Sequence, residues 1–154
     1  MSPMILYYSK SGTTEKLATR IQADLGCNLL KVEPENPYGN YISAVIRFLW
    51  ESAKGVTPKT RTAVPNLKVH DIVLIGYPLW GGDIPPFFKA FLQSTDLSGK
   101  AIIPFATSGG VGIEKSVGTL RSICPNSKII HPLHVGRMKQ DNYDDWLSIV
   151  KKSE

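Results

Sequence analysis

The sequence predicts an α/β domain in which helices cover both faces of a parallel sheet. Apolar segments short enough to be strands recur at 4–8, 28–33, 71–77, 101–106 and 128–135. Segments with helical periodicity separate them, at 13–25, 40–54, 84–95, 113–123 and 141–152. Strands that alternate with helices along the chain are typical of doubly wound α/β proteins.

The segment 71–77 is the clearest sign that the strands are parallel. From Ile72 to Ile75 it is continuously apolar and mostly β-branched. A strand that is apolar at every position is buried on both faces, as in a parallel sheet between two layers of helices.

The helical segments indicate which of their sides face the core. In 40–54 an apolar stripe is formed by Tyr41, Val45, Phe48 and Leu49. In 141–152 we expect Asp141 or Asn142 to cap the helix start. On the buried face of this last helix we expect Trp146, Leu147 and Ile149.

Length and composition are those of an ordinary globular protein. The 154 residues, 42% of them hydrophobic, suit one domain over 1–154. No apolar run reaches the roughly 20 residues that span a bilayer, and the start lacks a leader pattern, so we expect a cytoplasmic protein without a membrane span. Cys27 and Cys124 have no metal-type or CxxC spacing and are expected to be buried thiols.

The net charge of +5 is concentrated in one segment. Around the single acid Glu51 lie the cations Arg47, Lys54, Lys59, Arg61 and Lys68. Such a patch can attract an acidic partner or a phosphorylated cosubstrate, although a solvated surface is the simpler interpretation. Because no nucleic-acid motif accompanies the charge, we do not expect nucleic-acid binding.

Three loops with unusual chemistry follow predicted strands: the first loop (9–14), the second loop (78–86) and the third loop (107–112). In open parallel sheets, ligands bind beyond the carboxyl ends of the strands. If the sheet is doubly wound, the three loops converge on one crevice, which is stronger evidence of a site than any loop alone.

The first loop has the composition of an anion cradle. Its hydroxyl side chains are Ser9, Ser11, Thr13 and Thr14, with Gly12 among them and a helical segment directly after. Hydroxyls and helix-start amides suit phosphate oxygens. Neither GxxxxGK[ST] nor GxGxxG is present, so the loop suits one terminal monophosphate. An ordinary helix cap is the alternative, but a cap needs one hydroxyl.

The second loop has a large aromatic residue, Trp80, beside Gly81 and Gly82. An indole at a strand end can stack on a flat ligand ring, and glycines allow close approach of the backbone. The alternative is a core tryptophan followed by a turn. The third loop combines hydroxyl and glycine residues and is weak evidence alone.

The loops together resemble those of the flavodoxin family. Residues 9–14, Ser-Lys-Ser-Gly-Thr-Thr, resemble the family's phosphate loop T/S-x-T-G-x-T. Residues 76–82, Gly-Tyr-Pro-Leu-Trp-Gly-Gly, resemble its second flavin loop, often GYPIWWG, with Gly81 in place of a second tryptophan. Residues 105–110 and the terminal Trp146-Leu147 pair also fit the order of that family.

The resemblance implies a flavodoxin-like three-layer sandwich with a five-stranded parallel sheet of order 2-1-3-4-5 and FMN as cofactor. It also implies the residues that bind the cofactor. The phosphate would be held by Ser9, Lys10, Ser11, Gly12, Thr13 and Thr14. The flavin ring would be bordered by Pro78, Leu79, Trp80, Gly81 and Gly82, and on the opposite rim by Thr107, Ser108, Gly109 and Gly110.

The implied function is electron transfer by FMN between a partner reductase and an acceptor, with no catalytic side chain and no metal. His70, His131 and His134 lie outside the loops and are expected to be structural or surface residues. Because familiar flavodoxins are acidic and this chain is basic, two alternatives stay open. One is an NAD(P)H-dependent quinone or flavin reductase, and the other a non-catalytic flavin- or partner-binding module. The residue on the second flavin face, Tyr41 or Trp50, and the oligomeric state also stay open.

Overall fold

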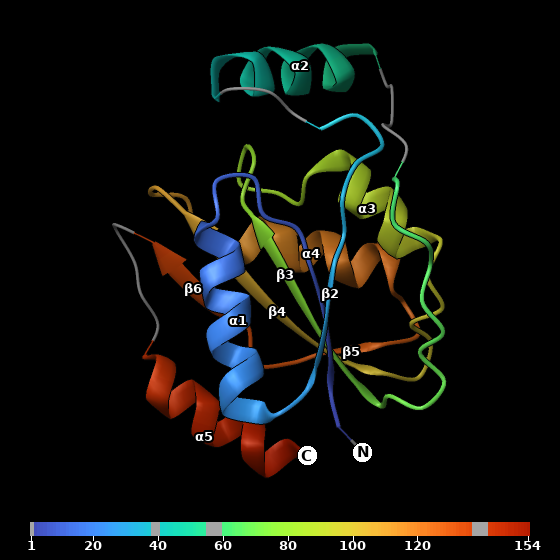
Figure 1. Cartoon of the computed structure of the whole chain (residues 1–154), viewed down its shortest axis with the longest axis vertical. Coiled ribbons are helices and arrows are strands. Elements are labelled where there is room, and N and C mark those ends of the chain that lie inside the picture. The colour runs from blue at the N-terminus through green and yellow to red at the C-terminus, as the bar shows by residue number, and fades with distance from the viewer. Residues whose placement is uncertain (1, 38–40, 55–59, 137–141) are drawn as a thin grey trace.

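A parallel sheet of order β2-β1-β3-β4-β5 lies at the centre of the computed structural model, which describes residues 2–37, 41–54, 60–136 and 142–154 (Figure 1). The strands are β1 (Met4–Tyr7), β2 (Asn28–Lys31), β3 (Ile72–Pro78), β4 (Ala101–Ser108), β5 (Lys128–Ile129) and β6 (Leu133–Gly136). Every strand pair in the sheet is parallel. The predicted order is confirmed, and β3 is buried as its apolar run indicated.

The predicted strand 128–135 is wrong in one respect, because it is divided into β5 and β6. Both pieces pair with β4, and β6 pairs with its carboxyl-terminal half. His131 between them has φ +48°, which extended strands do not adopt, and Pro132 has no N–H for the ladder. The His131 carbonyl instead accepts a 2.7 Å hydrogen bond from Trp146 Nε1.

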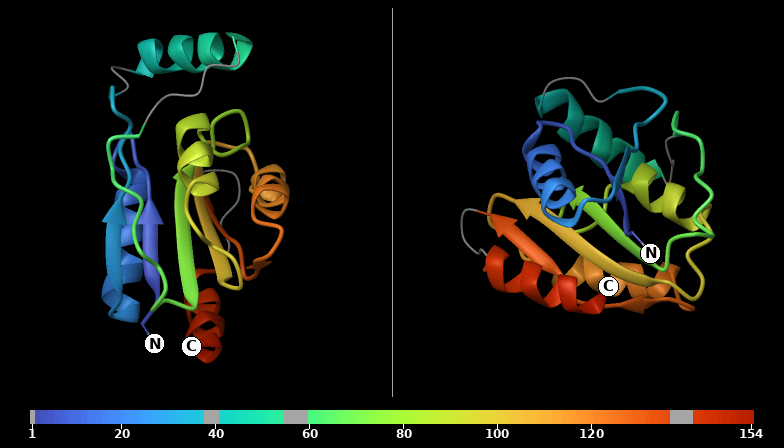
Figure 2. Two further views of the ribbon diagram at one scale, coloured as in Figure 1. Left: turned by 90° about the vertical axis from the view of Figure 1, so that its right-hand side faces the viewer. Right: turned by 60° about the horizontal axis from the view of Figure 1, so that its bottom comes forward.

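Helices form a layer on each face of the sheet, as predicted (Figure 2). The helices are α1 (Thr13–Leu25), α2 (Tyr41–Lys54), α3 (Pro86–Gln93), α4 (Glu114–Ile123) and α5 (Tyr143–Ser153), and all except α2 belong to these layers. On one face α1 and α5 pack on side chains such as Ile5 and Leu74. On the other face α3 and α4 pack on their neighbours, such as Leu6 and Val73. This division follows from the alternation of side chains along each strand.

The last helix is capped as predicted, but it is rotated about its own axis relative to the predicted orientation, so that Val150 and not Ile149 faces the core. Asn142 accepts hydrogen bonds from the N–H groups of Asp144 and Asp145, while Asp141 lies outside the described residues. Trp146 and Val150 are buried, but Ile149 is 46% exposed, so its predicted burial is wrong. Ile149 lies about 100° around the helix from Val150, which takes the inward position.

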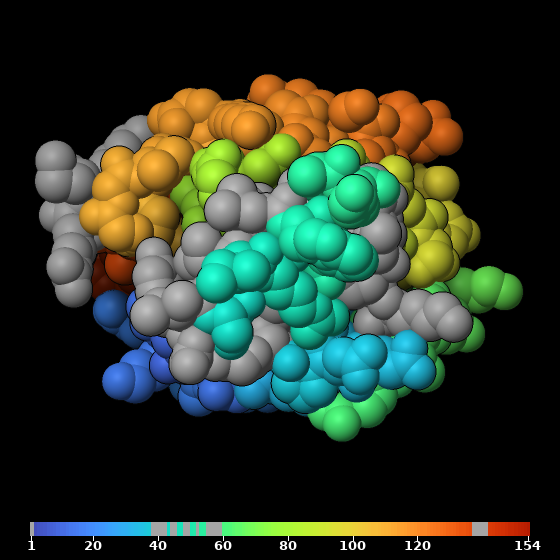
Figure 3. All heavy atoms as spheres, turned by 90° about the horizontal axis from the view of Figure 1, so that it is seen from above, coloured from blue at the N-terminus to red at the C-terminus, as the bar shows by residue number. Residues whose placement is uncertain are grey.

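The helix α2 lies beyond the carboxyl ends of the strands, across that end of the molecule (Figures 1 and 3). Its Ile46 and Trp50 are 62% and 56% exposed, respectively, and lie one turn apart. Arg47 Nε lies 2.6 Å from the buried carboxylate of Glu51. The side chains of the predicted stripe (Tyr41, Val45, Phe48 and Leu49) and Lys59 lie outside the described part of the chain.

None of the helices among the described residues is long and apolar enough to cross a membrane. Within the same residues, no cluster of three His, Cys, Asp or Glu side chains is arranged to hold a metal ion. Cys27 and Cys124 are free and buried, as predicted. Burial raises the pKa of the Cys27 thiol to about 11.

Candidate functional site

A pocket of about 720 Å³ opens where the three loops meet, at the carboxyl ends of β3, β4 and β6. It is lined by Ser11, Thr13, Pro78, Leu79, Trp80, Thr107, Ser108, Gly109, Val135 and Gly136. The expected convergence of the three loops is therefore observed. Its volume lies within the range of small-molecule sites, about 300–1,000 Å³.

Some residues predicted from the sequence do not line this pocket: Ser9, Lys10, Gly12, Thr14, Gly81, Gly82 and Gly110. Val135 and Gly136, at the end of β6, line it and were missed. The rule that placed the other loops at strand ends also applies to the last strand. Val135 and Gly136 were missed because 128–135 was taken as one strand that ends at Val135, and no loop with hydroxyl or glycine clusters was recognised after it.

The hydroxyl groups of the first loop are divided between two tasks. Ser9 Oγ accepts a 3.0 Å hydrogen bond from the Gly12 N–H and so closes the turn, whereas the resemblance implied that Gly12 binds the phosphate. Ser11 Oγ and Thr13 Oγ1 lie 3.3 Å apart on the exposed side and line the pocket. Gly12, with φ +91°, occupies the N-cap position of α1, and no side chain caps this helix. The helix-cap interpretation of the hydroxyls therefore does not account for Ser11 and Thr13.

The donor set of this corner suits a phosphate. The first helical hydrogen bond of α1 runs from Lys16 N–H to Gly12 O, so the preceding first-turn amides have no carbonyl of the helix to bind. They add to the hydroxyl donors of Ser11 and Thr13 at the positive end of the helix dipole. None of the described residues that line the pocket is acidic. An anion bound here would contact hydrogen-bond donors and would not be repelled by a carboxylate among the lining residues.

Thr107 connects the three loops. Its Oγ1 lies 2.7 Å from Thr14 Oγ1, and both hydroxyls are buried. Its carbonyl accepts a 2.9 Å hydrogen bond from the Leu79 N–H of the second loop. One residue at the end of β4 thus holds the start of α1 and the segment that leads to Trp80.

The second loop contains a tight two-residue turn at Gly81 and Gly82. Trp80 and Asp83 exchange backbone hydrogen bonds of 2.9 and 3.1 Å across Gly81 and Gly82. The two glycines have φ +61° and +77°, the left-handed values that such a turn requires. Where the family often has a second tryptophan, this chain therefore has a backbone conformation that disfavours any side chain.

Trp80 is part of an aromatic cluster at the edge of the pocket. Tyr8, at the end of β1, meets it edge to face, with ring centroids 5.8 Å apart and planes at 84°. The Tyr8 ring packs in the same way on Phe87, at 4.6 Å and 86°. Edge-to-face contacts restrain the indole plane. Trp80 is thus both packed against the core and available to the pocket.

An ion-pair network lies next to the first loop. Tyr7 Oη donates a 2.8 Å hydrogen bond to Glu15 Oε1, and Lys31 Nζ lies 3.3 Å from the same oxygen. The hydrogen bond from Tyr7, and then that from Lys31 with its charge, lower the pKa of Glu15. Lys31 also pairs with Glu33, which pairs in turn with Arg61. Part of the basic segment is therefore neutralised locally.

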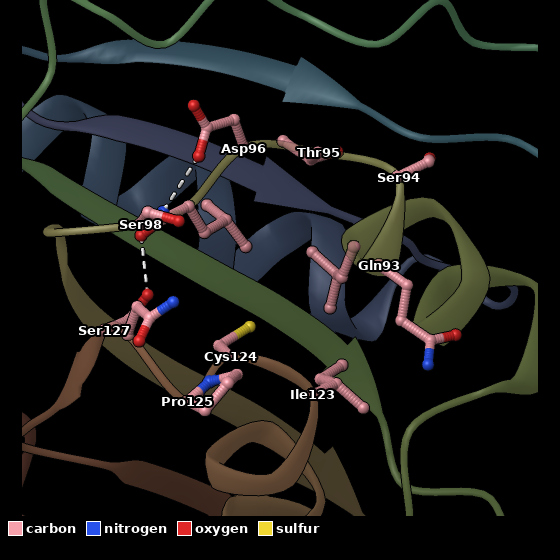
Figure 4. Close-up of a pocket in the computed structure, with 12 residues that line it drawn as sticks. Gln93, Ser94, Thr95, Asp96, Ser98, Ile123, Cys124, Pro125 and Ser127 are labelled. Atoms are coloured by element: carbon pink, nitrogen blue, oxygen red, sulfur yellow. Dashed lines mark hydrogen bonds between the residues drawn. The ribbon is translucent and has the colours of Figure 1, made fainter.

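A second pocket, of about 380 Å³, lies between the ends of α3 and α4 and the starts of β4 and β5 (Figure 4). Ser94 and Thr95 donate to the Phe91 carbonyl, and Ser127 donates to that of Leu97. Its hydroxyl groups therefore close the helix ends and the loop, so this pocket is a weaker candidate than the first.

The sheet order reverses between β1 and β3, and the first and second loops follow these two strands. The fold and the pocket thus define a doubly wound α/β protein with its ligand site at the topological switch point. A family model described as flavodoxin matches residues 3–150. The chain belongs to the flavodoxin family.

Solved structures agree with this assignment. A candidate flavoprotein from Bacteroides uniformis is 21% identical, with a TM-score of 0.79 and 97% of each chain covered. A candidate flavoprotein from Bacteroides eggerthii is 26% identical, with a TM-score of 0.77, over 99% of this chain and 96% of that one. A flavoprotein from Lactobacillus acidophilus, solved in complex with FMN, is 23% identical, with a TM-score of 0.74, over 96% and 98%. A comparison with curated protein sequences finds no match.

Proposed function

We propose that this protein binds FMN in the pocket between the three loops and transfers electrons between a partner reductase and an acceptor. The observation that carries the proposal is the composition of the pocket. A corner of hydroxyl and amide donors lies in the same cavity as a restrained tryptophan. These are the two features that a phosphorylated ligand with a flat ring requires.

FMN, the cofactor expected from the sequence, is supported by the family match and by the FMN complex of the Lactobacillus acidophilus protein. The donor set fits it, because Ser11, Thr13 and the first-turn amides of α1 offer hydrogen bonds to a phosphate. Ser9 and Thr14 would act indirectly, by holding the shape of the turn and the start of the helix.

Trp80 and Leu79 would border the flavin ring on one side, and Thr107, Ser108 and Gly109 its opposite rim. Bound FMN supplies the electron-transfer chemistry, which no side chain of the pocket provides. The protein would orient the ring, restrict water around it and influence its potential through these contacts.

A reductase that oxidises NAD(P)H is the second candidate, because this chain is basic, with a net charge of +5, whereas familiar flavodoxins are acidic. Nicotinamide cofactors and acidic partner proteins are both anionic, so either would be attracted by this chain. Lys54 and Lys68 are exposed, whereas Arg47 and Arg61 each pair with a carboxylate. Localisation in the cytoplasm stays a prediction.

Titration of the purified full-length protein with FMN tests the proposal. We expect the flavin fluorescence to be quenched to a saturating end point. A colourless protein that leaves the fluorescence unchanged would contradict FMN binding.

Anaerobic kinetics separate the two roles. Rapid reduction by a ferredoxin-type reductase with slow direct NAD(P)H oxidation supports the carrier. Fast NAD(P)H oxidation with a quinone present supports the reductase. A protein that binds FMN but is reduced by neither donor would be a non-catalytic module.

A further inference from the structure

His134 lies inside β6 and is completely buried. Its Nε2 lies 2.6 Å from the Oγ of Ser108, the last residue of the neighbouring strand β4. Ser108 Oγ also donates a 2.6 Å hydrogen bond to the carbonyl of Val111. A continuous chain of hydrogen bonds thus runs from the interior of β6 to the third loop.

The direction of these hydrogen bonds follows from the number of protons. A serine hydroxyl has one hydrogen to donate and can also accept. Because that hydrogen points to the Val111 carbonyl, the His134 Nε2–H must be the donor to Ser108. A nucleophilic serine needs the opposite arrangement, in which histidine takes the hydroxyl proton. His134 therefore serves as a fixed donor rather than as a base.

The backbone of β6 approaches Ser108 closely at Gly136. A Cβ placed on Gly136 would lie 2.7 Å from the Ser108 carbonyl oxygen and 3.2 Å from both Ser108 Oγ and His134 Nε2. Only glycine permits so close an approach of β6 to β4 at this point. Ser108 thus bonds to the His134 side chain and lies close against the backbone of Gly136.

We propose that His134 is a positioning residue for the flavin ring, acting through Ser108 on the third loop. Ser108 and Gly109 line the pocket, so a change in their position reaches the ligand directly. The inference rests on the proposed FMN site. It adds a role for a buried histidine that belongs to none of the three loops.

The test compares His134→Leu, which removes the donor, with His134→Gln, whose amide offers an N–H near the position of Nε2. His70→Gln is the matched control, because His70 is a partly exposed histidine that bonds to the Ser2 carbonyl, remote from the pocket residues. The affinities of the flavin-free protein for FMN and for riboflavin are measured by fluorescence quenching, and visible circular dichroism records the setting of the bound ring.

We expect His134→Leu to lower the affinities for FMN and for riboflavin by the same factor, about tenfold, because both ligands contain the ring that the third loop would contact. The flavin dichroism should change, and His134→Gln should restore most of both properties. In a Ser108→Ala background, His134→Leu should have a much smaller effect, since residues in one network are not additive.

Unchanged affinities in a folded His134→Leu variant would overturn the proposal, as would a loss confined to FMN or full additivity with Ser108→Ala. If His134→Leu does not fold, His134→Gln alone tests the proposal. If the folded His134→Gln protein binds both flavins tenfold more weakly, an N–H donor to Ser108 is not sufficient to position the ring, and the proposal is overturned. A wild-type protein that binds neither flavin contradicts the proposed function itself, and the role of His134 with it.

Discussion

Thr14 and Thr107 lie 93 residues apart in the chain and share a buried hydrogen bond of 2.7 Å. One hydroxyl belongs to the first turn of α1 and the other to the end of β4, so the bond joins the first and third loops directly. The two residues are 1% and 5% exposed, so a hydroxyl that loses its partner is left in a largely desolvated position. The pair is therefore a coupled structural unit at the edge of the pocket.

Single Thr14→Val and Thr107→Val variants should each lose about 1–3 kcal/mol of unfolding free energy, because each leaves one buried hydroxyl without a partner. The thermal midpoint should fall by about 2–4 °C for each kcal/mol. The double variant should be more stable than the sum of the single losses predicts. Strict additivity in the thermal melts would show that the two hydroxyls are independent.

The phosphate corner can be tested with paired ligands. Ser11→Ala combined with Thr13→Ala should weaken FMN by at least tenfold while riboflavin changes little, because only FMN has a phosphate to bind. Fluorescence titration of both ligands provides the measurement. Equal losses would mean that the loop only shapes the ring site.

The tight turn of the second loop predicts a penalty for side chains. Gly81→Ala should destabilise the protein by about 1 kcal/mol or more, because alanine is strained at φ +61°. Gly118→Ala is the matched control, since Gly118 lies within α4 with open space around it, and should stabilise by about 0.5–1 kcal/mol. Urea melts of both variants give the sign of each change in unfolding free energy. If both substitutions change the stability in the same direction, the strained turn at Gly81 is not supported.

Glu15 predicts a specific loss of stability in acid. The hydrogen bonds from Tyr7 and Lys31 hold its pKa in the folded protein below the ordinary value of a glutamate, so its contribution to stability is present above that ordinary value and is lost as the pH falls through the folded pKa. Urea midpoints at neutral pH and below pH 4 should therefore differ less in Glu15→Gln than in the wild type. Glu35→Gln, at an exposed position, is the control and should resemble the wild type.

The thiol of Cys27 should be unreactive in the folded protein. Its pKa of about 11 and its 6% exposure leave little thiolate at pH 8 and little access. Alkylation of Cys27, followed by mass spectrometry, should be slow in buffer and fast in concentrated urea. Rapid modification of the native protein would show that the β2 end opens readily.

The layers and the three loops could be predicted from local signals, whereas the sheet order was implied only by the resemblance to the flavodoxin family. Continuous apolar runs such as 72–75 indicate buried strands, and hydroxyl or glycine clusters mark the strand ends. The division of the last strand was missed: Pro132 is a local signal against one continuous strand, but the contact between the His131 carbonyl and the distant Trp146 is not visible in the sequence. The same applies to Thr14, whose hydroxyl resembled a ligand donor until its partner, Thr107, was known.

The side chain of Ile149 illustrates how precisely the buried face of a helix can be predicted from the sequence. The apolar periodicity indicated α5, and Asn142 was a candidate for its cap. A short amphipathic helix with several apolar residues can, however, turn either of two neighbouring apolar residues toward the core, and these lie about 100° apart around the helix axis. Only the packing of Val150 against the core decides between them.

The hydrogen bond from Trp146 to His131 also ties the C-terminal helix to the architecture of the pocket. It holds the chain at the break between β5 and β6, directly before the strand that carries Val135 and Gly136 to the pocket wall. The shape of the ligand site is thus partly encoded in a helix that contributes none of the lining residues. Differences in cofactor affinity among relatives can therefore originate in α5 as well as in the loops.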